Sequence, residues 1–306
     1  MERVVITGVA GGLGRLLARR LREAHDVIGV DSEPWTTRPA GTPFHQVDVR
    51  KRAFEDVLRK VRPTALVHLG FVRHFRGSEG ACYDLNVRGT RKVLDLCHEH
   101  GVRECVVLSS SYVYGAQAEN PYFMDEEHPL SGSRNYPEIR DLVEVDTLAV
   151  TFMWKHTDLR TCVLRPVPTL GRYHSTAIGT YLRMSRPITM MGFNPMIQFL
   201  HEEDLCEALA LAVEKGLRGV YNVAGPGEVP LQTALREIGA RPLPLPDFVA
   251  RPLLERTFRA GWFPFPPGAI DYIKYTCTIN GKRFVDATGF RPQYSLKEIF
   301  RSVRRV

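Results

Sequence analysis

The 306-residue sequence predicts an α/β protein built on a doubly wound parallel β-sheet, with a smaller C-terminal lobe. Short β-branched runs alternate with amphipathic stretches through the N-terminal half, a glycine-rich loop follows the first run, and prolines cluster in the C-terminal half. Strands of a parallel sheet are covered by helices on both faces, so they form continuous hydrophobic runs of this kind. Right-handed crossovers between such strands give a doubly wound sheet.

The first half of the chain supplies predicted strands and helices in alternation. The hydrophobic runs at residues 4–6, 26–30, 65–69, 105–108 and 161–164 are predicted as buried strands, with a further strand at residues 44–47. The stretches at residues 13–23, 53–62, 85–100 and 137–156 are amphipathic and are predicted as helices. This alternation is typical of βαβ units.

The second half has a looser pattern. Prolines recur between residues 166 and 267 with shorter elements between them, which indicates a loop-rich lobe. Two segments, residues 197–213 and 220–223, still resemble parts of the sheet. We therefore expect a sheet domain at residues 1–170, to which residues 196–226 return, and an interleaved lobe made mainly of residues 171–306.

Composition and cysteine usage narrow the class of protein. With 44% hydrophobic and 25% charged residues, the chain is neither disordered nor collagen-like. The six cysteines are too far apart in sequence for a zinc or redox pair, so neither a disulfide framework nor a structural metal is expected. His68, His74, His174 and His201 share no ligand spacing either. A reducing cytoplasm fits these features, and we expect no signal peptide or membrane span.

Most of the net charge of +7 lies from Lys282 onward. A basic segment has two interpretations, a contact with an anionic surface or a solvated helix face, and we favour the solvated face. The sequence contains no nucleic-acid-binding motif, so no nucleic-acid partner is expected.

A glycine-rich loop lies directly after the first predicted strand. Gly8, Gly11 and Gly14 stand between this strand and the first helix. The first glycine permits a tight turn, the second lets a pyrophosphate approach the backbone, and the third lets the helix pack closely on the strand. The amino end of the helix then faces the phosphates. The loop therefore predicts a Rossmann-type dinucleotide site.

Two aspartates are expected near the adenosine of this dinucleotide. Asp31 ends the second strand, where a carboxylate accepts hydrogen bonds from both ribose hydroxyls and repels a 2′-phosphate. We therefore favour NAD over NADP, although nearby Arg38 would suit NADP. Asp48 follows the third strand, where it would lie at the adenine amino group. The alternative for Asp48 is a surface aspartate at a strand end.

Further motifs follow one another along the chain. They are NVRGT at residues 86–90, SSSYVYG at 109–115, YPEIR at 136–140, LRP at 164–166, HEED at 201–204, YNV at 221–223 and GFRP at 289–292. Together with the glycine loop, these motifs resemble the extended short-chain dehydrogenase/reductase family, of the NAD-dependent epimerase/dehydratase type. The resemblance covers almost the whole chain.

The resemblance implies reversible hydride transfer between NAD and an alcohol or ketone. Such a transfer needs a proton moved on or off the substrate oxygen. The resemblance implies Tyr136 as this acid/base, Ser110 as the residue that holds the oxygen, and Asn86 as a positioning residue. It also implies a set of cofactor-binding positions: Gly8, Gly11, Gly12, Leu13, Gly14, Asp31, Asp48, Val49, Leu69, Gly70, Asn86, Ser109, Tyr136, Arg140 and Pro166.

The chain departs from the family pattern at Arg140. In the family, a lysine four residues after the tyrosine lowers the pKa of the phenol, which is about 10 in free tyrosine, and holds the nicotinamide ribose. Arginine keeps the charge, but it stays protonated and cannot relay a proton. Three interpretations remain open: a working substitute in an active enzyme, the mark of a binding protein that has lost catalysis, or a consequence of an arginine-rich composition.

Two other departures concern the reaction and its substrate. Dehydratases of the family carry an acidic pair where this chain has Ser111 and Tyr112, so dehydration is not expected. Many sugar-nucleotide enzymes of the family have an asparagine where this chain has Pro168, which weakens a sugar-nucleotide substrate and leaves room for an apolar one. We expect an NAD-dependent oxidoreductase or epimerase; the alternative is a catalytically impaired NAD-binding regulatory or scaffold protein.

Two segments are predicted to contact partners or the core. Residues 248–263 mix apolar side chains with Arg251, Arg256 and Arg259, which suits an anionic membrane surface or the wall of an apolar pocket. We favour a helix packed on the core. The predicted helix at 137–156 is apolar on more than one face, so it must be covered on both sides. A second copy of the chain is the expected cover, which predicts a homodimer, and the C-terminal lobe is the alternative.

Overall fold

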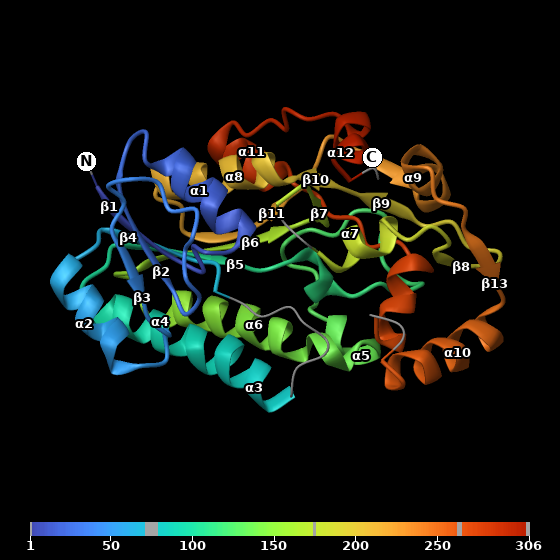
Figure 1. Ribbon diagram of the computed structural model, residues 1–306, viewed down its shortest axis with the longest axis horizontal. Coiled ribbons are helices and arrows are strands. Elements are labelled where there is room, and N and C mark those ends of the chain that lie inside the picture. Colours follow the sequence, from blue (N-terminus) through green and yellow to red (C-terminus); the bar gives the residue numbers. More distant parts are fainter. Residues whose placement is uncertain (1, 71–78, 174–175, 262–264, 304–306) are drawn as a thin grey trace.

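The computed structural model describes residues 2–70, 79–173, 176–261 and 265–303 (Figure 1). A seven-stranded parallel sheet has the order β11-β6-β5-β4-β1-β2-β3. Its strands are β1 (Arg3–Thr7), β2 (Asp26–Asp31), β3 (Phe44–Gln46), β4 (Ala65–His68), β5 (Glu104–Leu108), β6 (Arg160–Pro166) and β11 (Gly219–Val223). The predicted α/β class with a doubly wound parallel sheet is confirmed. Strand order reverses at β1, which places a crevice at the carboxyl ends of β1 and β4.

Helices cover both faces of the sheet. α1 (Gly12–Leu21), α8 (Glu202–Glu214) and α11 (Lys282–Thr288) lie on one face, and α2 (Arg52–Val61), α4 (Gly89–Glu99) and α6 (Arg140–Lys155) lie on the other (Figure 1). Alternate residues of each strand face opposite sides. In β5, Val106 and Leu108 join the core under α1 and α8, whereas Cys105 and Val107 join the core under α2, α4 and α6.

Two predicted helices begin differently from the expectation. The helix expected at 85–100 starts with a π-helical turn, η1 (Asp84–Arg88), before α4. The helix expected at 137–156 starts with a 3₁₀ turn, η3 (Pro137–Ile139), and α6 begins only at Arg140. A proline disfavours helical backbone in the residue before it, and Tyr136 accordingly has φ −132° and ψ 75°. Tyr136 and Arg140 are therefore not on one continuous α-helix.

The rest of the chain builds a lobe at the end of the molecule away from α2 (Figure 1). Its elements are β7 (Thr169–Leu170), α7 (Ala177–Leu182), β8 (Ile188–Met190), β9 (Met196–Gln198), β10 (Leu200–His201), β12 (Glu228–Pro230), α9 (Leu231–Ile238), β13 (Leu243–Leu245), α10 (Asp247–Arg259), η4 (Pro267–Ile273) and α12 (Leu296–Val303). Three two-stranded pairs, β10-β7, β12-β9 and β13-β8, lie outside the main sheet. The chain enters the lobe after β6 and comes back through α8 to β11 at the sheet edge.

Some sequence features lie outside the described residues, namely His74, His174, Trp262, Phe263, Arg304 and Arg305. Among the helices that are described, none is both long and apolar enough to cross a membrane. On α6, Trp154 is 69% exposed and carries the Arg218 guanidinium over its ring. The predicted cover for this face, a second copy of the chain, stays a prediction.

Candidate functional site

The glycine loop closes tightly against the carboxyl ends of β1 and β4. Gly8 has φ +75°, and a Cβ atom there would lie 2.8 Å from the main-chain carbon of Leu69. A Cβ atom at Gly14 would lie 2.4 Å from the carbonyl oxygen of Gly8. At Gly11 the nearest atom is the same oxygen at 3.3 Å. The first and third glycines are therefore required by the backbone itself, as the loop motif predicts.

The amino end of α1 is open for an anion. Gly11 is its N-cap residue and offers no side chain, and the first turn of the helix contains no acidic residue. The first N–H groups of a helix lack partners within the helix and carry a partial positive charge. Gly12, Leu13 and Gly14 thus present main-chain donors beside the loop, which fits the pyrophosphate of NAD.

Asp31 lies beside this loop at the end of β2. Its Oδ2 accepts a hydrogen bond from the Ala10 N–H at 2.8 Å, and its Oδ1 accepts one from the Glu33 N–H at 3.0 Å. These two bonds fix the carboxylate and leave lone pairs for ribose hydroxyls. The structure therefore places Asp31 beside the glycine loop, and its contact with a ribose stays a prediction.

Asp48 is hydrogen-bonded to Arg50, a contact that the sequence did not predict. Arg50 donates to Asp48 Oδ2 from Nη2 at 2.6 Å, and its main-chain N–H donates to Oδ1 at 2.9 Å. The Arg50 hydrogen bond lowers the pKa of Asp48. Val49, the next residue, is buried against α4 at Gly89. A contact between Asp48 and adenine stays a prediction.

We expect Gly14→Ala to weaken NAD binding at least ~10-fold and to lower the free energy of unfolding by more than about 1 kcal/mol, because a 2.4 Å contact forces the helix off the loop. Calorimetric NAD titration and urea denaturation would measure the two effects. Gly80→Ala is the matched control, because a Cβ atom at Gly80 meets no atom of the described residues within 4 Å. Equal NAD affinity in Gly14→Ala and Gly80→Ala would contradict the prediction that the glycine loop binds the pyrophosphate of NAD.

A buried polar chain leads from the loop to the start of α6. His68 Nδ1 lies 2.6 Å from Thr7 Oγ1, and its Nε2 lies 3.2 Å from Thr90 Oγ1. The Thr90 hydroxyl donates to the main-chain oxygen of Asn86, whose amide donates to Asp141 in α6. Burial lowers the pKa of His68 to about 3, so the imidazole is neutral. Asn86 thereby joins η1 to α6, and its role as a positioning residue for the reaction stays a prediction.

A second buried network fixes α6 against β5 and β6. Arg165 at the end of β6 donates to both carboxylate oxygens of Asp146, at 2.6 and 2.9 Å. Ser109, after β5, donates to the same carboxylate at 2.5 Å. All three residues are buried. The proton of the Ser109 hydroxyl is therefore used within the protein, and a contact of this residue with a cofactor stays a prediction.

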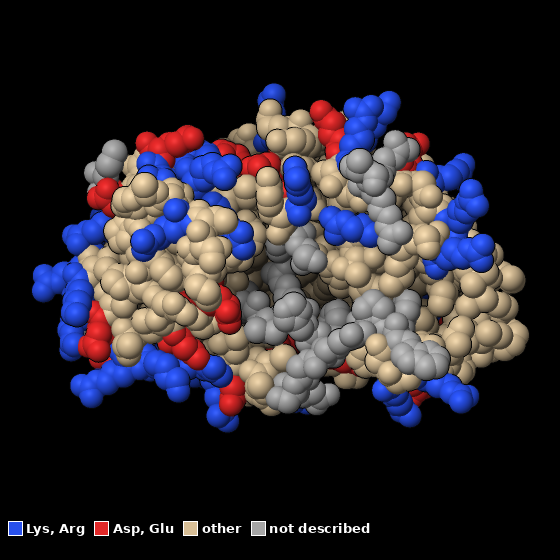
Figure 2. Space-filling view, viewed as in Figure 1, with Lys and Arg blue, Asp and Glu red and all other residues tan. Residues whose placement is uncertain are grey.

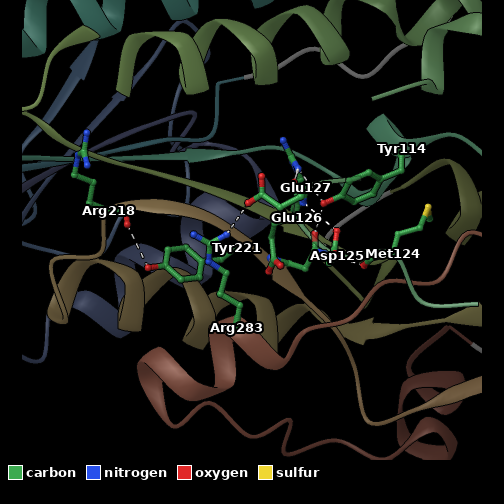
Figure 3. A network of polar contacts seen from close by, with 10 residues as sticks. Tyr114, Met124, Asp125, Glu126, Glu127, Arg218, Tyr221 and Arg283 are labelled. Carbon is green, nitrogen blue, oxygen red and sulfur yellow. Dashed lines mark hydrogen bonds and ion pairs between the residues drawn. The ribbon is translucent and has the colours of Figure 1, made fainter. Parts of the chain in front are cut away.

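The same network reaches β11 and the loop after η2 (Ser111–Tyr114). The Tyr114 hydroxyl accepts from Arg165 at 2.9 Å and donates to Asn222 at 2.7 Å. Glu126 accepts from the Asn222 N–H at 2.8 Å. Figure 3 shows Tyr114 and Glu126 pointing toward the end of β11, beside Tyr221. Five segments that meet at the carboxyl edge of the sheet are thus held by one set of bonds.

Two of the predicted catalytic residues, Ser110 and Tyr136, differ in burial and in their contacts. Ser110 is half-buried at the end of β5, and its hydroxyl accepts a hydrogen bond from the Tyr112 N–H at 3.3 Å. Tyr136 is buried, and its ring packs against Tyr272 with centroids 5.8 Å apart. Burial raises the pKa of Tyr136 well above its usual value, and the charges of Tyr112 and Glu138 raise it further.

Arg140, the third predicted catalytic residue, lies in a different environment from Tyr136. Its side chain is exposed, and its charge acts on the phenol of Tyr83, where it lowers the pKa against the larger opposite effect of Glu144. Within the described part of the chain, Arg140 makes no hydrogen bond with Tyr136 and is not among the charges that act on that phenol. Its predicted role as the cation below Tyr136 stays a prediction. Pro166 ends β6 and is buried nearby in the sheet.

A narrow apolar slot with a cavity volume of about 60 Å³ lies between the segment after β5 and the C-terminal lobe. Tyr112 and Tyr136 line it on the sheet side, and Tyr181, Leu254 and Tyr272 are part of the lobe side. No residue of its described lining carries a charge. The Tyr181 hydroxyl donates to the carbonyl of Ile188 and that of Tyr272 to the carbonyl of Tyr112, so these rings offer the slot mainly apolar surface.

Two features of the structure were not predicted from the sequence. Glu138, between Tyr136 and Arg140, has a buried carboxylate oxygen with no hydrogen-bond partner in the described part of the chain. The side chains of His98, His156 and Asp158 also meet, with His98 Nδ1 2.9 Å from Asp158. The latter cluster lies where α4 and α6 end, at the edge of the sheet opposite the glycine loop. His156 and Asp158 are two positions apart in the sequence, but only the contact of α4 with α6 brings His98 to them.

The model of the NAD dependent epimerase/dehydratase family matches residues 4–224. The chain belongs to this family. The family predicted from the motifs is thereby confirmed, and its dependence on NAD agrees with the predicted cofactor.

Relatives and solved structures match most of the chain, including residues beyond those that the family model matches. An uncharacterized protein of Mycobacterium tuberculosis (strain H37Rv) is 25% identical over 309 residues, covering 97% of this chain and 82% of that protein. A UDP-glucose 4-epimerase of Rhizobium leguminosarum bv. trifolii is 25% identical over 293 residues, 85% of this chain and 82% of that enzyme. The structure of Thermus thermophilus UDP-glucose 4-epimerase complexed with NAD has a TM-score of 0.76 at 20% identity and covers 98% of this chain and 97% of its own. This last likeness shows a shared fold.

Proposed function

We propose that this family member is an NAD-dependent oxidoreductase or epimerase that acts on an alcohol or ketone by reversible hydride transfer. The observation that carries the proposal is the position of Tyr136 in the wall of the apolar slot, at the sheet edge that also holds the glycine loop. NAD, when bound, supplies a hydride acceptor or donor. Gly8, Gly11, Gly14 and Asp31 would hold its pyrophosphate and ribose.

Ser110 and Tyr136 act on the oxygen of the substrate. Ser110 orients the substrate oxygen, and Tyr136 exchanges a proton with it. Because the pKa of Tyr136 is raised, its phenol is protonated near neutral pH and suits donation to a carbonyl oxygen. Because a protonated phenol can donate without first being activated, this protonation state favours the reduction of a ketone. Oxidation requires the positive charge of Arg140 to reach the phenol.

The slot also supports a choice of substrate class. Sugar nucleotides carry a pyrophosphate, which proteins bind with arginine, lysine or main-chain donors. The described lining of the slot contains no such charged group, and its walls are aliphatic and aromatic. We therefore propose an apolar ketone or alcohol in preference to a sugar nucleotide, although relatives of the chain include UDP-glucose 4-epimerases.

One observation supports a second candidate, a catalytically impaired NAD-binding regulatory or scaffold protein. Arg140 is exposed and Tyr136 is buried among groups that raise its pKa. A family member in this state would bind NAD without turning over a substrate. Arg140→Lys separates the two candidates: an active enzyme adapted to arginine loses activity, whereas an impaired protein stays inactive or gains activity.

We expect Tyr136→Phe to lower turnover at least ~100-fold, because the phenol is the proton donor, while the dissociation constant for NAD changes less than about threefold. The assay follows NADH consumption with decalone and cyclohexanone as apolar ketones. For UDP-glucose, the polar alternative, it follows conversion to the 4-epimer by chromatography, because an epimerase returns the hydride to its substrate and forms no net NADH. Tyr181→Phe is the matched control, because Tyr181 lines the same slot with its hydroxyl bonded to the main chain.

The outcomes are distinct. Turnover of the ketones that survives Tyr136→Phe would refute the assignment of Tyr136. NAD binding without turnover of either substrate class would favour the regulatory candidate. Turnover of UDP-glucose alone would refute the apolar substrate class and leave the reaction type standing.

A further inference from the structure

We propose that the outer face of α10 docks on an anionic lipid bilayer. α10 has apolar residues on both sides. Ala250 and Leu254 face inward and are buried in the core of the lobe, whereas Phe248, Val249 and Leu253 face outward and are 80%, 40% and 42% exposed. An apolar face that the described part of the chain leaves exposed marks a contact surface.

The exposed residues form one stripe along the helix. Phe248, Val249, Pro252 and Leu253 are all exposed and are separated by one, three, four or five positions, which places them on one side of an α-helix. Leu243 of neighbouring β13 adds a further apolar side chain that is 47% exposed. A helix with an uncovered apolar face and a basic border suits the interface between headgroups and acyl chains of a bilayer.

Charge around the stripe favours anionic lipid as the occupant. Arg256 follows the stripe one turn after Pro252, is exposed, and has no ion pair in the described part of the chain. Arg186 and Arg241 are exposed just before β8 and β13, the paired strands at the same end of the molecule. Figure 2 shows this end largely without charged side chains, with Lys and Arg side chains above and below it.

The acidic groups of α10 and η4 are already neutralised by other residues. Asp247 accepts hydrogen bonds from Lys274 and Arg251, and Asp271 pairs with Arg251 at 2.6 Å. Glu255 pairs with Arg259. Of the three arginines that the sequence suggested for a membrane contact, Arg251 therefore fastens α10 to the lobe and Arg256 is left for lipid phosphates.

The position of α10 relative to the slot distinguishes a bilayer from a protein partner. Leu254, on the inner face of the helix, lines the apolar slot. One helix thus has its outer side toward the proposed bilayer and its inner side toward a pocket suited to apolar compounds, which concentrate in bilayers. The docking itself does not depend on the reaction proposed above, so turnover is not needed to test it.

Flotation of the full chain with vesicles would test this inference. We expect binding to vesicles of phosphatidylcholine with about one third phosphatidylglycerol, and at least ~10-fold weaker binding to phosphatidylcholine alone. The double variant Phe248→Ser/Leu253→Ser is expected to lose at least ~10-fold in partition coefficient, and Arg256→Gln about threefold or more. All three residues are exposed, so these variants leave the core intact.

Two variants are matched controls. Val285→Ser changes an apolar residue on α11 that is 41% exposed, close to the 42% of Leu253, and Arg52→Gln removes an exposed arginine from α2. Both are expected to bind like the unmodified chain. Absence of binding to anionic vesicles, or equal binding by the double variant, would overturn the proposal. A dimer in sedimentation equilibrium that Phe248→Ser/Leu253→Ser dissociates would overturn it too, because the stripe would then be a subunit interface.

Discussion

Asp146→Asn is expected to lower the free energy of unfolding by about 3–5 kcal/mol. The change removes the charge that Arg165 needs, with little change in volume, and the guanidinium is then left buried and unpaired. The side chains of Arg165 and Asp146 are only 4% and 0% exposed, so water cannot replace the lost partner. Burial opposes the charged form of Arg165, but Asp146 holds its pKa above the usual value, which shows how strongly the pair is coupled.

The measurement is urea denaturation of the unmodified chain and its variants. Asp286→Asn is the control, because the Lys282–Asp286 pair on α11 has side chains that are 72% and 59% exposed and is expected to change stability by less than about 1 kcal/mol. The double variant Asp146→Leu/Arg165→Met is expected to recover much of the loss, because it buries no charge. A loss below about 1 kcal/mol in Asp146→Asn would show that the network contributes little to stability.

Acid destabilisation is expected to depend strongly on His68. The pKa of its imidazole is about 3 in the folded protein, because of burial, and about 6.5 in an unfolded chain. Above pH ~6.5 the residue is neutral in both states, and its contribution to stability is complete. Between pH ~6.5 and ~3 only the unfolded state binds the proton, so stability falls by up to about 1.4 kcal/mol per pH unit from this group alone.

His68→Gln tests this expectation. Glutamine does not titrate and can still bond one of the two threonines, so the variant should be less stable near neutral pH but less sensitive to acid. The free energy of unfolding, measured from about pH 8 down to about pH 4, should fall less steeply in the variant than in the unmodified chain. Identical slopes would mean that His68 takes up its proton in the folded state as readily as in the unfolded state.

The two variants affect different parts of the same site. The bonds of Asp146 tie α6 to β5 and β6, beside Ser109 and Ser110. The bonds of His68 tie the glycine loop through Asn86 to the start of α6. Moderate loss of either network should therefore change how the glycine loop and Tyr136, the proposed proton donor, lie relative to each other before the fold is lost.

Local patterns in the sequence determined the sheet and the cofactor. The hydrophobic run at β1 and the three glycines after it act over about ten residues, and their backbone requirements do not depend on distant contacts. The same holds for Asp31, because the end of β2 is fixed by the parallel sheet next to the loop. For this reason the family, the fold class and NAD followed from spacing and residue type.

The tertiary structure alone decided how the catalytic candidates are arranged. Sequence spacing places Tyr136 and Arg140 four positions apart, yet Pro137 interrupts the helix, Tyr136 packs under Gly268 and Tyr272, and Arg140 turns to solvent. The pairing of Asp146 with Arg165 and the lining of the slot by Leu254 join residues far apart in sequence. The ion pair depends on how α6 packs on β6, and the slot depends on how the lobe packs on the sheet. Such packing is a property of shape and burial that no local pattern encodes.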